Sequence, residues 1–261
     1  MTHPRREPHR AMFRSFRRCS MTPSIKAVLF DKDGTLIDFR ATWVAAYRGV
    51  TEELAEKAGG GRELADRLLR RAGYDPDTDS FAEDSPLLWA TCDLVTALWA
   101  ADPALEHLGD VHGVVQEHFG DHRRYPPVPI GDLPGLLERL RSRRLSLGIA
   151  TMDSTEKARA TAASLGIEEH FDFIVGADAG HGCKPEPGMV HAFCEAVGCE
   201  PAETLVVGDS RADLAMARNA GCGAAVAVRT GGTPDRLLAE LADVVIEDVQ
   251  ELDALLDRLA A

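Results

Sequence analysis

Two aspartates spaced two residues apart follow a short apolar run, and this segment constrains the chain more than any other. The apolar run covers residues 27–30, and Asp31-Lys32-Asp33-Gly34-Thr35 comes directly after it. Carboxylates at the end of a buried strand are costly unless a metal ion or a proton pairs with them. One chemistry that uses such a pair is a nucleophilic carboxylate beside a second carboxylate that acts as general acid and base.

Two other readings of this segment have to be weighed. Asp-Gly is common in surface turns, and Asp-Lys-Asp-Gly also resembles the start of a calcium-binding loop. A calcium loop that begins at Asp31 needs an oxygen ligand at its fifth position, glycine at its sixth and glutamate at its twelfth. The chain has Thr35, Leu36 and Thr42 there, so the spacing argues against a calcium loop. The segment alone does not decide between a turn and a site, and the rest of the chain must.

Three further apolar runs are short and rich in β-branched residues, as strands buried on both faces are. They are residues 145–150, before Thr151; residues 171–175, before a glycine-rich loop and Lys184; and residues 204–207, before Gly208 and Asp209. Helical patterns at residues 154–165 and 187–197 separate these runs. Alternating strands and helices predict a parallel sheet with right-handed crossovers.

The polar residues that follow these runs should meet at one edge of the sheet. Ligands of open α/β sheets bind at the carboxyl ends of the strands. Asp31, Thr151, Lys184 and Asp209 each have an ordinary interpretation alone, such as a helix cap or a surface lysine. Four groups of complementary chemistry at successive strand ends instead indicate a single site.

These four motifs together resemble the signatures of the haloacid dehalogenase-like (HAD) superfamily of phosphohydrolases, over roughly residues 24–250. Within it, the chain looks like the phosphoglycolate phosphatase group. The resemblance implies an α/β fold, with a Rossmann-like parallel-sheet core at residues 23–38 and 128–261 and an inserted helical cap at residues 39–127. It also implies a Mg²⁺-dependent phosphatase that hydrolyses a small phosphomonoester, phosphoglycolate or similar, through an aspartyl-phosphate. A phosphotransferase such as a sugar-phosphate mutase, and a non-catalytic binding protein, remain alternatives.

The resemblance gives each carboxylate a role. Asp31 is the expected nucleophile, and Asp33 is the expected general acid and base, which favours phosphoryl transfer over dehalogenation. Mg²⁺ is expected at the Asp31 carboxylate, the Asp33 backbone carbonyl and Asp209. Asp213 lies one helical turn after Asp209 and is expected either as an outer metal group or to orient Lys184.

Two residues near the expected phosphate contacts and the nucleophile depart from the family pattern. The resemblance implies that the Thr151 hydroxyl and the Lys184 ammonium bind the phosphoryl oxygens. Met152 follows Thr151, where the family often has asparagine. Lys32 stands beside the nucleophile, where the family usually has an apolar or aromatic residue. This lysine either faces away from the site or tunes it.

The long insertion between the first strand and the rest of the core is predicted to be a helical unit. Its length exceeds that of an ordinary connection. Helices are predicted at residues 41–58, 63–72, 87–101 and 103–119. Such a unit resembles the family's cap, which closes over the phosphate and selects the leaving group. The cap candidates for substrate contact are Phe39, Arg40, Trp43, Tyr47 and Arg48. We expect Trp43 and Tyr47 to pack in the cap core and Arg40 to bind a substrate anion.

Charge and cysteine content limit the partners. The 261 residues carry a net charge of −13. Residues 1–20 hold six arginines and one glutamate, so the remaining residues carry −18. This acidic body argues against nucleic acid, and no apolar stretch approaches the ~20 residues that span a membrane. The six cysteines show no metal-site spacing, which favours reduced thiols and a cytoplasmic location. We therefore expect a small phosphorylated metabolite as partner, a monomer or homodimer, and a disordered basic extension at residues 1–22.

Overall fold

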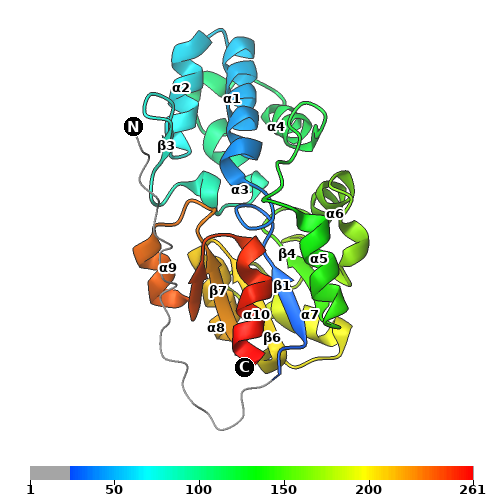
Figure 1. The fold of residues 1–261 in the computed structure, drawn as a ribbon. Coiled ribbons are helices and arrows are strands. Elements are labelled where there is room, and N and C mark those ends of the chain that lie inside the picture. Colours follow the sequence, from blue (N-terminus) through cyan, green and yellow to red (C-terminus); the bar gives the residue numbers. More distant parts are fainter. Residues whose placement is uncertain (1–23, 261) are drawn as a thin grey trace, which may run out of the picture.

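The computed structural model describes residues 24–260, and the predicted extension at residues 1–22 lies outside them. A sheet with helices on both faces forms the lower part of the molecule in Figure 1, and a helical unit stands over one end of it. Among the described residues, no helix combines the length and the apolar character needed to cross a membrane.

Six parallel strands form the sheet, in the order β5-β4-β1-β6-β7-β8. They are β1 (Ala27–Phe30), β4 (Ser146–Ala150), β5 (Phe173–Val175), β6 (Thr204–Gly208), β7 (Ala224–Val228) and β8 (Val244–Ile246). Val28 in the central strand β1 is in register with Leu147 on one side and Leu205 on the other. The predicted parallel sheet is confirmed, and β7 and β8 extend it beyond the four predicted strands.

Helices cover both faces of the sheet because strand side chains alternate between them. Val28 and Phe30 pack on one face with α5 (Leu133–Ser142), α6 (Thr155–Ser164) and α10 (Leu252–Ala260). Ala27 and Leu29 pack on the other with α7 (Gly188–Val197), α8 (Arg211–Ala220) and α9 (Asp235–Leu241). Each fully buried Phe or Leu contributes about 2 kcal/mol from its removal from water, so both faces hold β1 rigidly.

The helical unit has a hydrophobic core of its own, around residues such as Leu54, Leu68, Trp99 and Val115. Its elements are α1 (Phe39–Lys57), α2 (Gly61–Arg71), β2 (Tyr74–Asp75), β3 (Ser80–Phe81), η1 (Pro86–Leu88), α3 (Cys92–Ala100), η2 (Pro103–Leu105) and α4 (Val111–Gly120). We call this unit the cap.

Helices α3 and α4 are shorter than the two predicted ones because side chains cap them later in the sequence. Thr91 accepts a hydrogen bond from the Leu94 backbone, and Asp110 accepts one from the Gly113 backbone. Such oxygens satisfy amide groups that have no partner within the helix, so they set where the helix begins.

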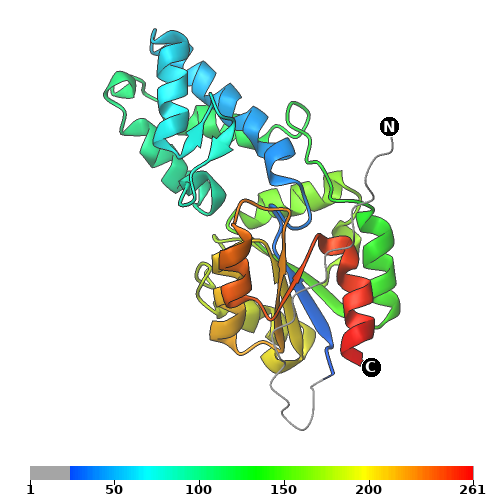
Figure 2. The ribbon, with the colours of Figure 1, turned by 60° about the vertical axis from the view of Figure 1, so that its left-hand side comes forward.

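The cap lies against the core, beyond the carboxyl ends of the strands (Figure 2). Arg236 of α9 donates to the Glu83 carboxylate over 2.6 and 2.7 Å. Lys157 of α6 donates to the Gln116 amide oxygen of α4 over 2.7 Å. These contacts from two core helices reach two different parts of the cap, so the structure shows the cap closed on the core.

Candidate active site

A cavity of about 100 Å³ lies between the cap and the strand ends. Its floor comes from the loops after β1, β4 and β6 and the loop before α7, where the sequence placed its candidate residues. The floor residues are Asp31, Asp33, Thr151, Met152, Asp153, Lys184, Asp209, Ser210, Ala212 and Asp213. The parallel sheet therefore brings together all the predicted strand-end groups.

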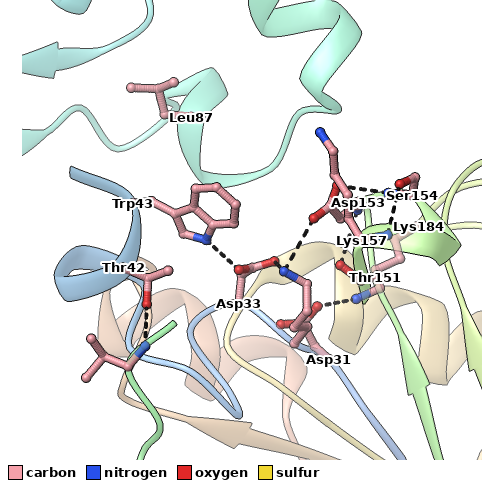
Figure 3. Close-up of polar contacts among 12 residues, drawn as sticks. Asp31, Asp33, Thr42, Trp43, Leu87, Thr151, Asp153, Ser154, Lys157 and Lys184 are labelled. Atoms are coloured by element: carbon pink, nitrogen blue, oxygen red, sulfur yellow. Dashed lines mark hydrogen bonds and ion pairs between the residues drawn. The ribbon is translucent and has the colours of Figure 1, made fainter. Parts of the chain in front are cut away.

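Lys184 joins two carboxylates at the centre of the floor. Its ammonium donates to Asp31 Oδ1 and to Asp213 Oδ1, each over 2.6 Å, and the bond to Asp31 is visible in Figure 3. The Asp31 backbone N–H donates to the Val207 carbonyl at 2.8 Å, which fixes the start of this loop to the neighbouring strand. All three side chains are buried, so the pairing compensates for removing these charges from water.

The electrostatics of Asp31 are unfavourable for its charged form. Burial, opposed by Lys184 and supported by the charges of Asp213 and Asp33, raises the pKa of Asp31 to about 7. Burial alone lowers the pKa of Lys184, but Asp213 and Asp31 outweigh it and raise that pKa above its ordinary value. Asp31 Oδ2 is buried and has no hydrogen-bond partner among the described residues. One more positive charge at Oδ2 would satisfy it.

Asp209 lies beside Asp31, and the backbone of two glycine residues packs closely against its carboxylate. A Cβ added to Gly34 would lie 2.7 Å from the Asp209 carboxyl carbon, and one added to Gly231 would lie 1.6 Å from its Oδ2. Gly34 also has a φ of +87°, a conformation that favours glycine. Burial, and then the charges of Asp31 and Asp213, raise the pKa of Asp209 well above its ordinary value.

The donor set fits a small divalent cation. Carboxylate oxygens of Asp31, Asp209 and Asp213 lie within 4.8 Å of one another. Mg²⁺ prefers oxygen ligands and carboxylates, and the unpartnered Asp31 Oδ2 leaves a ligand atom open to it.

Asp213 is less available to a metal than Asp31 and Asp209. Its Oδ1 accepts from Lys184, and its Oδ2 accepts from the Ser210 backbone at 3.0 Å and from the Ser210 hydroxyl at 2.5 Å. The Ser210 hydroxyl in turn accepts from the Asp213 backbone, which completes a capping box at the start of α8. Of its two expected roles, this geometry favours the orientation of Lys184.

Asp33 is held from the cap by Trp43. The Trp43 indole N–H donates to Asp33 Oδ1 over 2.5 Å (Figure 3). The Trp43 ring also stacks on Tyr47 and meets Phe119 edge to face, as its expected role in the cap core requires. The expectation was incomplete, because the same side chain bridges the cap to the predicted acid and base.

Lys32 is 1% exposed and is not among the described residues that line the cavity, but its side chain reaches two aspartates that do line it. Its ammonium forms an ion pair with Asp33 Oδ2 at 2.7 Å and a longer one with Asp153 Oδ2 at 3.5 Å. It also lies 5.3 Å from the centre of the Trp43 ring. Burial lowers the pKa of Lys32, but Asp33 and Asp153 outweigh burial and raise it. Asp153 was not identified as a site residue from the sequence. Its signal was Lys32, because a lysine directly after a buried strand needs a carboxylate partner.

Thr151 lies where the sequence placed it. The residue is 1% exposed and lines the cavity, and its oxygen accepts from the Asp153 backbone at 3.2 Å. Because that oxygen acts as acceptor in this bond, the hydroxyl hydrogen stays available to an oxygen in the cavity.

Arg40 is not brought to the site. Its guanidinium donates to the Asp79 carbonyl at 2.7 Å and to Asp79 Oδ2 at 2.8 Å, and it lies over the Phe81 ring. Arg40 is absent from the described residues that line the cavity. The expectation that it binds a substrate anion therefore finds no support, because α1 directs it toward the β2–β3 hairpin.

Comparison with known proteins agrees with this arrangement. A model of the haloacid dehalogenase-like hydrolases matches residues 25–221. A phosphoglycolate phosphatase of Chromobacterium violaceum is 33% identical over 87% of this chain and 95% of its own length.

Solved structures show the same fold. A HAD phosphatase from Thermococcus onnurineus superposes with a TM-score of 0.65 at 26% identity, over 89% of this chain and 98% of its own. A predicted phosphoglycolate phosphatase from Haemophilus somnus superposes with a TM-score of 0.68 at 16% identity, over 90% of this chain and 99% of its own.

Proposed function

The chain belongs to the haloacid dehalogenase-like hydrolases and is similar to phosphoglycolate phosphatases, and from this premise we propose its function. We propose that it is a Mg²⁺-dependent phosphatase that hydrolyses a small phosphomonoester. The single observation that carries this proposal is the surroundings of Asp31. Its Oδ1 is held by Lys184, its Oδ2 is buried without a partner, and Asp209 lies beside it. Such a carboxylate is positioned to attack and is incomplete without a cation.

Asp31 attacks phosphorus and forms an aspartyl-phosphate on its own side chain. The reaction brings one anion to another, so positive charge is required at the point of attack. Lys184 supplies part of it and stays in place because its ammonium also donates to Asp213. Thr151 donates its hydroxyl hydrogen to a phosphoryl oxygen.

Asp33 transfers the protons. It protonates the leaving oxygen in the first step and takes a proton from water in the second, when water releases phosphate from Asp31. The Trp43 N–H and the Lys32 ammonium hold its two oxygens, so the carboxyl group is oriented before substrate arrives. This orientation lowers the entropy cost of the proton transfer.

Mg²⁺ would be held by the Asp31 and Asp209 carboxylates and by the Asp33 backbone carbonyl. When bound, it neutralises charge between the phosphoryl group and Asp31. The two glycines around Asp209 keep this carboxylate packed against backbone, which restricts its motion.

The cap excludes water and sets the leaving group. Its ion pairs and hydrogen bonds to the core hold it closed, and closure strengthens the electrostatic interactions of the site.

We further propose a small phosphorylated metabolite as the substrate and the cytoplasm as the site of action. The acidic body and the absence of a membrane-crossing helix among the described residues are consistent with both.

The test is phosphate release from a panel of phosphomonoesters with Mg²⁺ or EDTA. Wild type, Asp31→Asn and the control Asp257→Asn, which changes an exposed carboxylate of α10, are compared. We expect Mg²⁺-dependent release by wild type and the control and a loss of at least about 1,000-fold in Asp31→Asn. Transfer of label from one sugar phosphate to another, without release to water, would instead support the mutase. No turnover of any ester would favour a binding protein.

A further inference from the structure

The roof of the cavity is apolar. The cap side chains above the phosphate site include Leu87, Leu88, Trp89, Val95 and Phe119. Trp89 is 50% exposed, so a large apolar ring also stands at the mouth of the cavity. Figure 3 shows Leu87 on the far side of the Trp43 ring from Asp33.

The polar groups of Trp43, Tyr47 and Cys92 in this roof already have hydrogen-bond partners. The Trp43 N–H is used by Asp33, and the Tyr47 hydroxyl donates to the Leu87 carbonyl at 3.2 Å. Cys92 accepts a hydrogen bond from the Gln116 amide. None of these groups is left to bind an anion on the leaving group.

No cationic side chain of the described residues lines the roof. Among residues 24–260, Lys184 is the lysine that lines the cavity, no arginine lines it, and Lys184 is held by two aspartates. Arg40 and Arg48 of α1 turn to Asp79 and Tyr74. Lys157 is bound to Gln116 and lies 5.9 Å from the centre of the Phe119 ring, outside the lining.

The charges of the floor add to this effect. Five aspartates line the cavity, namely Asp31, Asp33, Asp153, Asp209 and Asp213, against one lining lysine and the Lys32 ammonium that pairs with Asp33 and Asp153 from outside the lining. A divalent cation offsets two of them and the substrate phosphate brings further negative charge. A second anion on the substrate would meet this excess, in a space where burying an unpaired carboxylate is strongly unfavourable.

We propose that the cavity takes phosphomonoesters with an uncharged, largely apolar leaving group, such as an alkyl or arylalkyl alcohol, in preference to phosphoglycolate. This inference rests on the proposed phosphatase function and names its substrate class. Apolar groups gain from contact with the roof, and aromatic leaving groups can stack against Trp89 or Phe119.

The test compares esters of primary alcohols that differ in charge. Phosphoglycolate is set against isobutyl phosphate, in which an isopropyl group replaces the carboxylate at similar shape, and against benzyl phosphate. We expect kcat/KM for both neutral esters to exceed that for phosphoglycolate at least tenfold. A smaller ratio, or a preference for phosphoglycolate, would overturn the substrate class and leave the phosphatase intact. No Asp31-dependent release from any of the three would overturn the substrate class, and the wider ester panel then decides whether the phosphatase function falls as well.

A pair of charge variants tests the roof itself. Trp89→Arg adds a cation at the mouth, and we expect it to shift the ratio of kcat/KM toward phosphoglycolate by at least fivefold. Leu94→Arg adds the same charge at a residue that is 42% exposed and outside the lining, and it should leave the ratio unchanged. Because the readout is a ratio of two substrates, partial loss of folded protein does not affect it.

Lys157→Met tests the remaining cation near the roof. If Lys157 bound a leaving-group carboxylate, this variant would lose activity on phosphoglycolate selectively. We expect the substrate ratio to stay within a factor of two, and a selective loss would contradict the proposal.

Discussion

The indole N–H of Trp43 in the first cap helix donates a hydrogen bond to Asp33, in the loop after the first strand of the core. The bond crosses from one unit to the other, and Lys32 holds the second oxygen of the same carboxylate. The position of the cap and the orientation of the proposed acid and base are therefore coupled in the closed structure.

Trp43→Phe keeps an aromatic ring but removes the N–H donor. We expect kcat/KM to fall about tenfold, because one hydrogen bond to a charged group is worth about 1.5 kcal/mol and positions Asp33. Steady-state kinetics on a single ester measures this. Trp99→Phe is the control, since its N–H donates to the Leu68 carbonyl inside the cap. An equal loss of kcat/KM in both variants would show that Trp43 acts through cap stability alone.

Lys32→Met removes a buried cation and leaves Asp33 and Asp153 facing each other. We expect the free energy of unfolding in urea to fall by about 3 kcal/mol, at the low end for broken buried pairs because both carboxylates keep some solvent contact. Adding Asp153→Asn should restore part of the loss. Additive effects of the two changes would contradict the coupling of these residues.

Asp31 gives the metal-free protein a pH-dependent stability. Its pKa of about 7 lies above the value of 3.8 for an ordinary aspartate, so the folded state holds this proton more tightly than the unfolded state. The associated stability is present at low pH and is lost as pH rises to about 7, by an amount on the order of a few kcal/mol. In EDTA, Asp31→Asn should therefore be more stable than wild type at pH 8, with a smaller difference at pH 5.

Thermal unfolding at the two pH values, with EDTA or Mg²⁺, measures this. Mg²⁺ should raise the melting temperature of wild type at pH 8 and have little effect on Asp31→Asn, because binding to the folded state stabilises it. A difference between the two proteins that is the same at pH 5 and pH 8 would rule out the titration of Asp31 as its cause.

Asp209 and Asp213 should differ in their effect on Mg²⁺ binding. Asp209→Asn removes a proposed direct ligand, and we expect calorimetry to show Mg²⁺ affinity reduced about 100-fold or more. Asp213→Asn removes a group whose oxygens are used by Lys184 and Ser210, and we expect a loss of about tenfold, the range of an outer partner. The reverse order would mean that Asp213 is the metal ligand.

The sequence predicted the sheet-edge geometry well because that geometry follows from local patterns. Apolar runs such as residues 27–30 and 204–207 coincide with β1 and β6 to within one residue. Once parallel pairing is inferred, the carboxyl ends of these strands must lie at the same edge of the sheet. Asp31 and Asp209, which follow the two strands, must then lie at that edge as well. β7 escaped prediction because it is alanine-rich.

The contacts that depend on cap placement could not be predicted. The bond from Trp43 to Asp33 depends on how α1 leaves the core, which Asp38 sets by capping this helix and by its backbone bond to Val128. Arg40 lies three residues before Trp43 in the same helix but points to Asp79 instead. A sequence pattern shows which residues share a helix face, and the direction of that face is decided by packing.

The most direct test of the central claim is to trap the phosphorylated enzyme. Asp33→Asn is mixed with p-nitrophenyl phosphate and Mg²⁺, quenched in acid and digested, and the peptides are analysed by mass spectrometry. The p-nitrophenolate group leaves without much acid assistance, whereas water attack still needs Asp33 as base, so the intermediate should accumulate. We expect one phosphoryl group on the peptide that contains Asp31, and none in the Asp31→Asn/Asp33→Asn double variant. Phosphate release by wild type with no phosphoryl group on Asp31, or with one on another residue, would contradict the account.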